Sequence, residues 1–205
     1  GTGYADGGTA AINNFLAGTG STSFTLYYQA NLSTMQKFDT TGLFLNGSGG
    51  DFFTAVAGFG EKVLSVGANN SASFGFDAAN PINFFTMYAT SAQANNLTGT
   101  GFATGTPILQ AHLSQVDSSN FTVATTTPVL LDQGGGNGDQ WAGQTSVTGS
   151  GSTDVTAVVD SWDANYFPDF SLVQSLIVSF FNNSQVVPFN QVDPSQCMNT
   201  NTGTC

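Results

Sequence analysis

The sequence predicts a single all-β domain, an antiparallel β-sandwich of jelly-roll-like form with few short helices. Three observations predict this fold class. Apolar and polar residues alternate with a period of two along much of the chain. Clusters of Gly, Asn, Ser and Pro separate the alternating segments at the spacing typical of sandwiches and barrels. Helical periodicity is sparse.

The alternating segments are expected to be strands that bury one face. In the first of them, Phe24, Leu26 and Tyr28 share a face and the residues between them share the other. Later segments repeat this pattern with Phe, Leu, Val and Ala on the buried side. The expected strands cover residues 23–30, 71–77, 83–90, 108–116, 154–162 and 176–187.

Two short segments carry helix signals. Residues 9–16 could form two helical turns with Thr9 as the N-cap, but a strand or an ordered arm fits them equally well. Residues 169–175, after Pro168, could form one turn. Three glycine-rich stretches are expected to be surface loops, at residues 47–50, 132–140 and 149–151.

The chain is expected to form one domain over residues 1–205. A single β domain can hold a chain of 205 residues, and neither a repeat nor a convincing linker divides it. Residues 1–16 form a possible N-terminal arm, and residues 194–205 form a tail bounded by cysteine. No apolar run approaches the roughly 18 residues that cross a bilayer, so no membrane span is expected.

The charge balance argues against several classes of function. The chain has 13 acidic and two basic residues, a net charge of −11, and only 7% charged residues. Nucleic acids, phosphoryl groups and anionic membranes are all recognised through basic side chains, so none of them is expected as a partner. A surface of Ser, Thr, Asn and Gln suits an extracellular protein. The start at Gly1 rather than Met favours removal of a leader segment.

The sequence does not predict an enzyme. His112 is the single histidine, and it lies on the polar side of its strand between Gln110 and Ser114, as an exposed structural residue would. No Gly-x-Ser-x-Gly motif surrounds a serine, and both cysteines lie in the tail. Neither a Ser-His nor a Cys-His nucleophile is therefore indicated.

No cofactor is required by the sequence, and calcium is the ion it could hold. The glycine-rich loop at 132–140 offers carboxylate and amide oxygens, which calcium prefers. Their spacing matches neither an EF-hand nor a nonapeptide repeat, and a solvated turn is the alternative. The candidate ligands are Asp132, Asn137 and Asp139.

A glycan site is suggested where Asp160 and Asp163 flank Trp162. An indole ring offers a stacking surface for a sugar, and carboxylates accept hydrogen bonds from its hydroxyl groups. Trp141 is a second candidate aromatic. The alternative is a strand end in which Trp162 is buried and the acids are solvated.

The two cysteines, Cys197 and Cys205, are close enough in sequence to pair and close a small terminal ring. Such a disulfide would stabilise the tail by about 2–3 kcal/mol and would favour an oxidising compartment. Two free thiols are the alternative.

Four segments carry a resemblance to a known class. They are FFTAVAGFGEKVLSV, NFFTMYATSAQANNLTGTGFATGTPILQAHL, SWDANYFPDF and SFFNNSQVVPFNQVDPS, in this order between residues 52 and 195. Together they resemble secreted bacterial proteins of the PEP-CTERM sorting class. The resemblance implies export, C-terminal processing at the cell surface and residence in an exopolysaccharide matrix. It carries over no catalytic residue, and the Pro-Glu-Pro signal, apolar helix and basic tail of that class are not part of this sequence.

Two functions from different classes follow. The first is an extracellular structural protein of the cell surface or biofilm matrix, which self-associates into filaments by β-strand addition. In this hypothesis the arm lies along the sheet edge of a neighbouring copy. The alternative is that the arm folds back on its own domain as an edge strand or short helix. The second function is a glycan-binding module for exopolysaccharide. The apolar residues of the arm are Ala11, Ile12, Phe15 and Leu16.

Overall fold

The structure, a computed structural model, describes residues 2–36, 42–95, 100–130, 145–168 and 175–182. Within these residues the chain consists of antiparallel strands with one α-helix and one short 3₁₀ helix, so the all-β class is confirmed. The elements in chain order are β1 (Thr2–Asp6), α1 (Gly8–Ala17), β2 (Ser23–Asn31), β3 (Thr34–Gln36), β4 (Gly42–Leu45), η1 (Ser48–Gly50), β5 (Phe52–Val66), β6 (Ser71–Phe76), β7 (Asn83–Thr90), β8 (Thr106–Leu130), β9 (Thr145–Trp162) and β10 (Ser175–Asn182).

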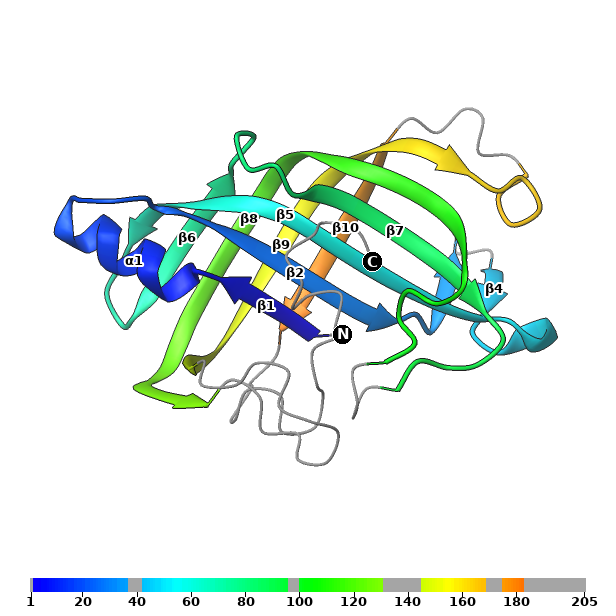
Figure 1. Ribbon diagram of the computed structural model, residues 1–205, viewed down its shortest axis with the longest axis horizontal. Helices are drawn as coiled ribbons and strands as arrows, with labels where there is room; N and C mark the ends of the chain where they lie inside the picture. Colours follow the sequence, from blue (N-terminus) through cyan, green and yellow to red (C-terminus); the bar gives the residue numbers. More distant parts are fainter. Residues whose placement is uncertain (1, 37–41, 96–99, 131–144, 169–174, 183–205) are drawn as a thin grey trace.

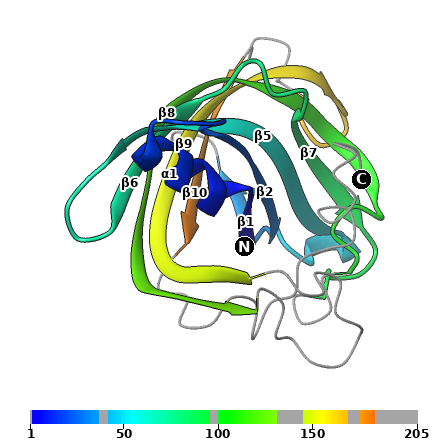
Figure 2. The ribbon, with the colours of Figure 1, turned by 60° about the vertical axis from the view of Figure 1, so that its left-hand side comes forward.

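One continuous sheet contains all these strands except β3 and β4, which form a separate two-stranded ladder. Its order is β1-β2-β5-β6-β8-β9-β10, with β7 also between β5 and β8. Strand β5 pairs with β7 along residues 52–59 and with β6 along residues 61–66, so β6 and β7 occupy one strand position in succession. Instead of splitting into two sheets, this sheet curls into a small barrel-like arrangement (Figures 1 and 2).

Gly60 makes the break between β6 and β7 possible. The chain between these strands, residues 77–82, lies directly on β5: the Asp77 amide donates to the Gly60 carbonyl at 3.0 Å. A Cβ at Gly60 would lie 2.2 Å from the Cβ of Asn80, so only glycine fits. The Asn80 side-chain amide then donates to the hydroxyl of Thr25 on β2 at 3.0 Å, which fixes the excursion to the sheet.

The alternating segments became strands close to where the sequence placed them. The segment expected at residues 83–90 is β7, those at 23–30 and 71–77 are β2 and β6 to within a residue, and those at 108–116 and 154–162 lie inside the longer β8 and β9. The last segment is β10 as far as residue 182, and the remainder lies outside the described residues. Of the turn expected at 169–175, residues 169–174 also lie outside them, and Ser175 is the first residue of β10. On β2, Phe24 is buried while Leu26 and Tyr28 pack half-buried against the core. The expectation that β2 buries only this face is wrong, because Tyr27 and Gln29 on the opposite face are buried as well.

The expected loop at residues 149–151 is wrong, because these residues lie inside β9. A Cβ at Gly149 would come within 2.3 Å of the Thr122 carbonyl oxygen, and one at Gly151 within 2.2 Å of the Asn120 carbonyl oxygen. The two glycines therefore allow β9 to approach β8 closely.

Apolar side chains form three clusters. The main cluster fills the inner face with residues from β5, β7, β8 and β9, including Phe59, Leu109 and Val155. A second cluster lies under α1 at one end of this face. A third cluster, which includes Tyr88 and Phe102, joins β5 and β7 to the chain that follows β7.

Residues 2–17 fold back on their own domain. Strand β1 pairs antiparallel with β2. Of the two structures that the sequence left open for residues 9–16, a helix is the one formed, as α1, and its N-cap is Gly7 rather than Thr9. Ala11 is buried in the end cluster and Ile12 is half-buried against it, whereas Phe15 and Leu16 are 36% and 65% exposed. This is the arrangement that the sequence left open as the alternative to an arm reaching a neighbouring copy. No helix in the described part of the chain is long and apolar enough to cross a bilayer.

Candidate functional site

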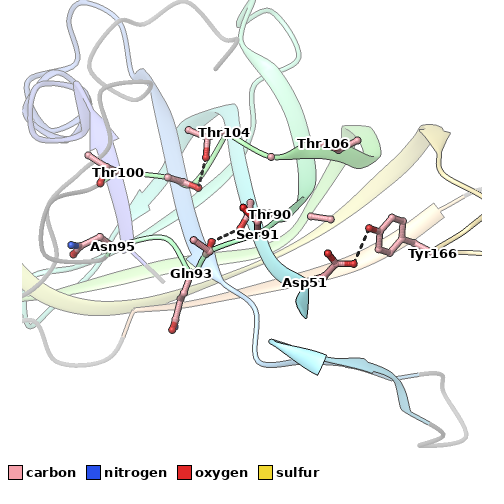
Figure 3. A pocket seen from close by; sticks show the side chains of 13 residues that line it. Asp51, Thr90, Ser91, Gln93, Asn95, Thr100, Thr104, Thr106 and Tyr166 are labelled. Atoms are coloured by element: carbon pink, nitrogen blue, oxygen red, sulfur yellow. Dashed lines mark hydrogen bonds between the residues drawn. The ribbon is translucent and has the colours of Figure 1, made fainter. Parts of the chain in front are cut away.

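A polar pocket of about 580 Å³ lies where β5 begins, β7 ends and β8 begins (Figure 3). Its volume falls within the range of small-molecule sites. Hydroxyl, amide and carboxylate groups dominate its side chains. The lining residues are Asp51, Ala89, Thr90, Ser91, Ala92, Gln93, Asn95, Thr100, Gly101, Thr104, Gly105, Thr106 and Tyr166.

Residues 91–95 and 100–105 supply most of this lining, and hydrogen bonds hold them to the sheet. Asn31 on β2 holds the first of these two segments with two hydrogen bonds: its side-chain amide donates to the Ala94 carbonyl at 3.0 Å, and its side-chain oxygen accepts from the Ala94 amide at 3.2 Å. Phe102 is buried against the sheet, and its carbonyl accepts a hydrogen bond from the buried Thr54 hydroxyl at 2.6 Å. These anchors fix the pocket wall to β2 and β5.

Glycines set how closely this chain returns to β7. A Cβ at Gly105 would lie 2.2 Å from the Ala89 carbonyl oxygen, so no larger residue fits without moving the backbone. Gly101 has a φ of +87°, which favours glycine, and a short bridge between Asn95 and Thr100 lies beside it. Glycine at positions 101 and 105 is therefore a structural requirement of the pocket.

Tyr166 enters the pocket from a turn at the end of β9. The Asp163 side chain accepts from the Asn165 amide at 2.8 Å, and the Asp163 carbonyl accepts from the amides of Tyr166 and Phe167. Phe167 is buried in the main cluster, and the Tyr166 ring packs edge-on against Phe53 with 5.9 Å between centroids. The turn and these aromatic contacts hold the phenol at a fixed place.

The Tyr166 hydroxyl donates to Asp51 Oδ2 at 3.0 Å, so this pair joins residues 115 positions apart. Figure 3 shows the pair on one side of the pocket, with Asn95 and Thr100 on the other. Burial first, then the hydrogen bond to Asp51 and the negative charges of Asp51 and Asp163, raise the pKa of Tyr166. The phenol therefore stays protonated, and the described lining residues carry negative but no positive charge.

The structure separates the three residues expected to form a glycan site. Asp160 accepts a hydrogen bond from His112 at 2.8 Å between two half-exposed side chains, so His112 is exposed as expected but has a carboxylate partner. Trp162 is 39% exposed at the end of β9, which makes it partly accessible. Asp163 is the one that approaches the pocket, because it builds the turn that carries Tyr166.

Several other expected site residues lie outside the described residues. These are the calcium candidates Asp132, Asn137 and Asp139, the aromatic Trp141, and the cysteines Cys197 and Cys205. Within the described ranges, no three His, Cys, Asp or Glu side chains gather in a way that could hold a metal ion.

Sequence reasoning missed the pocket itself. Asp51, the segment around Thr90 and Tyr166 belong to three distant parts of the chain, and only the strand register brings them together. The one available signal was the sequence Trp-Asp-Ala-Asn-Tyr, in which Asp and Asn favour a turn that would present the tyrosine.

Fold and site together define a class of protein. It is an antiparallel, barrel-like β protein with a pocket at one end of its sheet, and this pocket is lined mainly by hydroxyl groups together with an acidic side chain. No protein-family model, curated protein or solved structure matches the chain. The resemblance to PEP-CTERM proteins therefore stays a prediction.

Proposed function

We propose that the protein is an extracellular, non-enzymatic component of a cell-surface or biofilm matrix, and that it binds an exopolysaccharide in the pocket. The observation that carries this proposal is the lining as far as the structure describes it: hydroxyl and amide side chains with one carboxylate–phenol pair and no basic residue. Sugars present many hydroxyl groups, each of which donates and accepts hydrogen bonds, so a lining of Ser, Thr, Asn, Gln, Asp and Tyr complements them.

The same lining favours saccharide binding over saccharide hydrolysis. Glycoside hydrolysis generally uses two carboxylates that flank the scissile bond. The described part of the pocket lining contains one carboxylate, that of Asp51, and no histidine. Asp163, whose charge reaches Tyr166, already accepts two hydrogen bonds from Asn165 at 2.8 and 2.9 Å.

Isothermal titration of neutral oligosaccharides from matrix polysaccharide tests this function. The double variant Tyr166→Phe, Ser91→Ala removes two pocket hydroxyl groups, and at about 1 kcal/mol per hydrogen bond it should weaken binding at least tenfold. The matched control, Tyr28→Phe with Ser114→Ala, removes the same two groups away from the pocket and should leave affinity unchanged. Equal losses in both variants, or no saccharide binding at all, would contradict the proposal.

Sheet topology favours self-association as a second function. Strand β1 lies at one edge of the sheet and β10 at the other, and each pairs with a single neighbour among the described strands. Neither strand contains a charged residue except Asp6 at the end of β1. Charged side chains are a common means of blocking edge pairing, so these edges are suited to accept a strand from a second copy.

The direction of the strands indicates which edges would meet. The sheet has seven strand positions joined by antiparallel ladders, so β1 and β10 run in the same direction. Pairing β10 of one copy with β1 of the next, with the inner faces aligned, would give a parallel ladder, which is slightly less stable per residue than an antiparallel one. Two-fold pairing of β1 with β1, and of β10 with β10, gives antiparallel ladders. We therefore infer a filament of alternating two-fold contacts.

Sedimentation of edge variants separates the two arrangements. Ala5→Lys places a charge on β1, and Ile177→Lys places one on β10, where Ile177 is 74% exposed. With two-fold contacts, each single variant stops at a dimer and the double variant is a monomer. With head-to-tail contacts, either single variant alone gives monomers. An unmodified protein that stays monomeric at high concentration would contradict self-association.

A further inference from the structure

The Asp51 carboxylate gives the pocket a preference for positively charged ligands, which the uncharged hydroxyl groups of the lining do not provide. Its Oδ2 accepts the Tyr166 hydroxyl at 3.0 Å, while its Oδ1 accepts no hydrogen bond from the described residues. The backbone holds the residue in place, because the Asp51 carbonyl accepts from the Gly47 amide at 2.7 Å. A carboxylate oxygen is thus available on the pocket wall in a fixed position.

Among the residues that the structure describes, no Lys, Arg or His lines the pocket around Asp51. A second carboxylate, Asp163, lies close enough to Tyr166 for its charge to act on the phenol. The whole chain adds a net charge of −11. Like charges in a ligand would be repelled here, and a positive charge would be attracted.

We propose that the pocket selects saccharides that carry an ammonium group, with Asp51 as the residue that binds it. This inference rests on the proposed saccharide function and narrows its ligand class to amino-sugar polymers. The ammonium group of an unacetylated amino sugar donates to Asp51 Oδ1, while the remaining sugar hydroxyls bond to the Ser, Thr and amide groups of the pocket. Uronic acid polymers, which carry carboxylates, are excluded by the same charges.

The position of the Tyr166 phenol gives this tyrosine a role beside the Asp51 carboxylate. By donating to Oδ2, Tyr166 fixes the orientation of the Asp51 side chain and leaves the other oxygen for the ligand. Because the pKa of Tyr166 is raised, the phenol remains a donor and adds no negative charge across the neutral range. Tyr166 is therefore a positioning residue for the ammonium contact as well as part of the pocket wall.

Isothermal titration at pH 6 with three β-linked tetrasaccharides, of glucosamine, N-acetylglucosamine and glucose, tests this inference. The glucosamine tetramer should bind about five- to tenfold more tightly than the other two, and added salt should reduce the difference. Asp51→Asn should abolish this preference. The control Asp117→Asn makes the same change in net charge at an exposed site on β8 and should preserve it.

Each result has a distinct meaning. Equal affinity for the charged and uncharged tetramers overturns the ammonium inference and leaves the saccharide function standing. An equal loss of preference in Asp51→Asn and Asp117→Asn also overturns it, because overall charge would then be the cause. Failure of all three tetramers to bind contradicts both the inference and the proposed function.

Discussion

Glu61 is the single glutamate of the chain, and it lies inside the curled sheet. On β5 it pairs with Phe24 of β2 and Phe76 of β6, between the main cluster and the end cluster under α1. Its side chain is 1% exposed. Ser119 of β8 hydrogen-bonds to it and also to Thr153 of β9 at 2.8 Å, yet Glu61 Oε1 has no hydrogen-bond partner.

This environment makes the ionised side chain unfavourable in the folded protein. Burial raises the pKa of Glu61 to about 7, and the hydrogen bond from Ser119 opposes that rise only in part. In the unfolded chain the group ionises near its ordinary value of about 4.3. Between these values the folded state holds a proton that the unfolded state has lost, so stability falls as pH rises through this window. At about 1.4 kcal/mol per pH unit across this window, the free energy of unfolding falls by about 3 kcal/mol between pH 4.5 and pH 8.

The variant Glu61→Gln isolates this effect, because an amide resembles the protonated acid and does not ionise. Urea unfolding at pH 4.5 should give similar free energies of unfolding for the variant and the unmodified protein. At pH 8 the variant should be more stable by about 3 kcal/mol, which corresponds to about 10 °C in melting temperature for a chain of this size.

Comparing the two proteins at each pH removes the contribution of the other carboxylates, which they share. A difference between Glu61→Gln and the unmodified protein that stays constant from pH 4.5 to pH 8 would refute the reasoning.

Two further predictions concern the pocket wall. Gly105→Ala should lower stability by at least about 2 kcal/mol in urea unfolding, because its methyl group would collide with the Ala89 carbonyl, and a neutral result would contradict the tight approach. Asn31→Ala should expose the chain around Ala94 to proteolysis and faster hydrogen exchange, because it removes both side-chain bonds that hold it. Unchanged exchange there would show that Phe102 alone anchors the wall.

Strand positions were predictable wherever one face of a strand is buried and the other is polar. Strand β5 was not recognised from alternation, because residues 53–61 are buried on both faces: Val56 packs under Phe102 while Ala57 faces the main cluster. Burial on both sides removes the period-two signal. The prediction of a loop at residues 149–151 was wrong for a related reason. A glycine-rich composition cannot distinguish a loop from a strand that approaches its neighbour closely, as β9 does at Gly149 and Gly151.

Only one small part of the candidate site, the turn at Asp163, could be predicted from the sequence. The Asp163 turn could be read from sequence, because its side chain bonds to a residue two positions on. The Asp51–Tyr166 contact could not be predicted, because it depends on how each of the strands β5, β7, β8 and β9 is aligned with the next one in the sheet. Trp162, the candidate glycan-stacking residue, is not among the described residues that line the pocket.

The central claim is that saccharides bind in the pocket and not elsewhere on the sheet. Amide chemical shifts followed by NMR while glucosamine and glucose tetramers are added test it most directly. We expect perturbations confined to residues 51, 89–95, 100–106 and 163–166, larger with the glucosamine tetramer. Perturbations centred on the exposed His112–Asp160 pair, or none at saturating sugar, would contradict the claim.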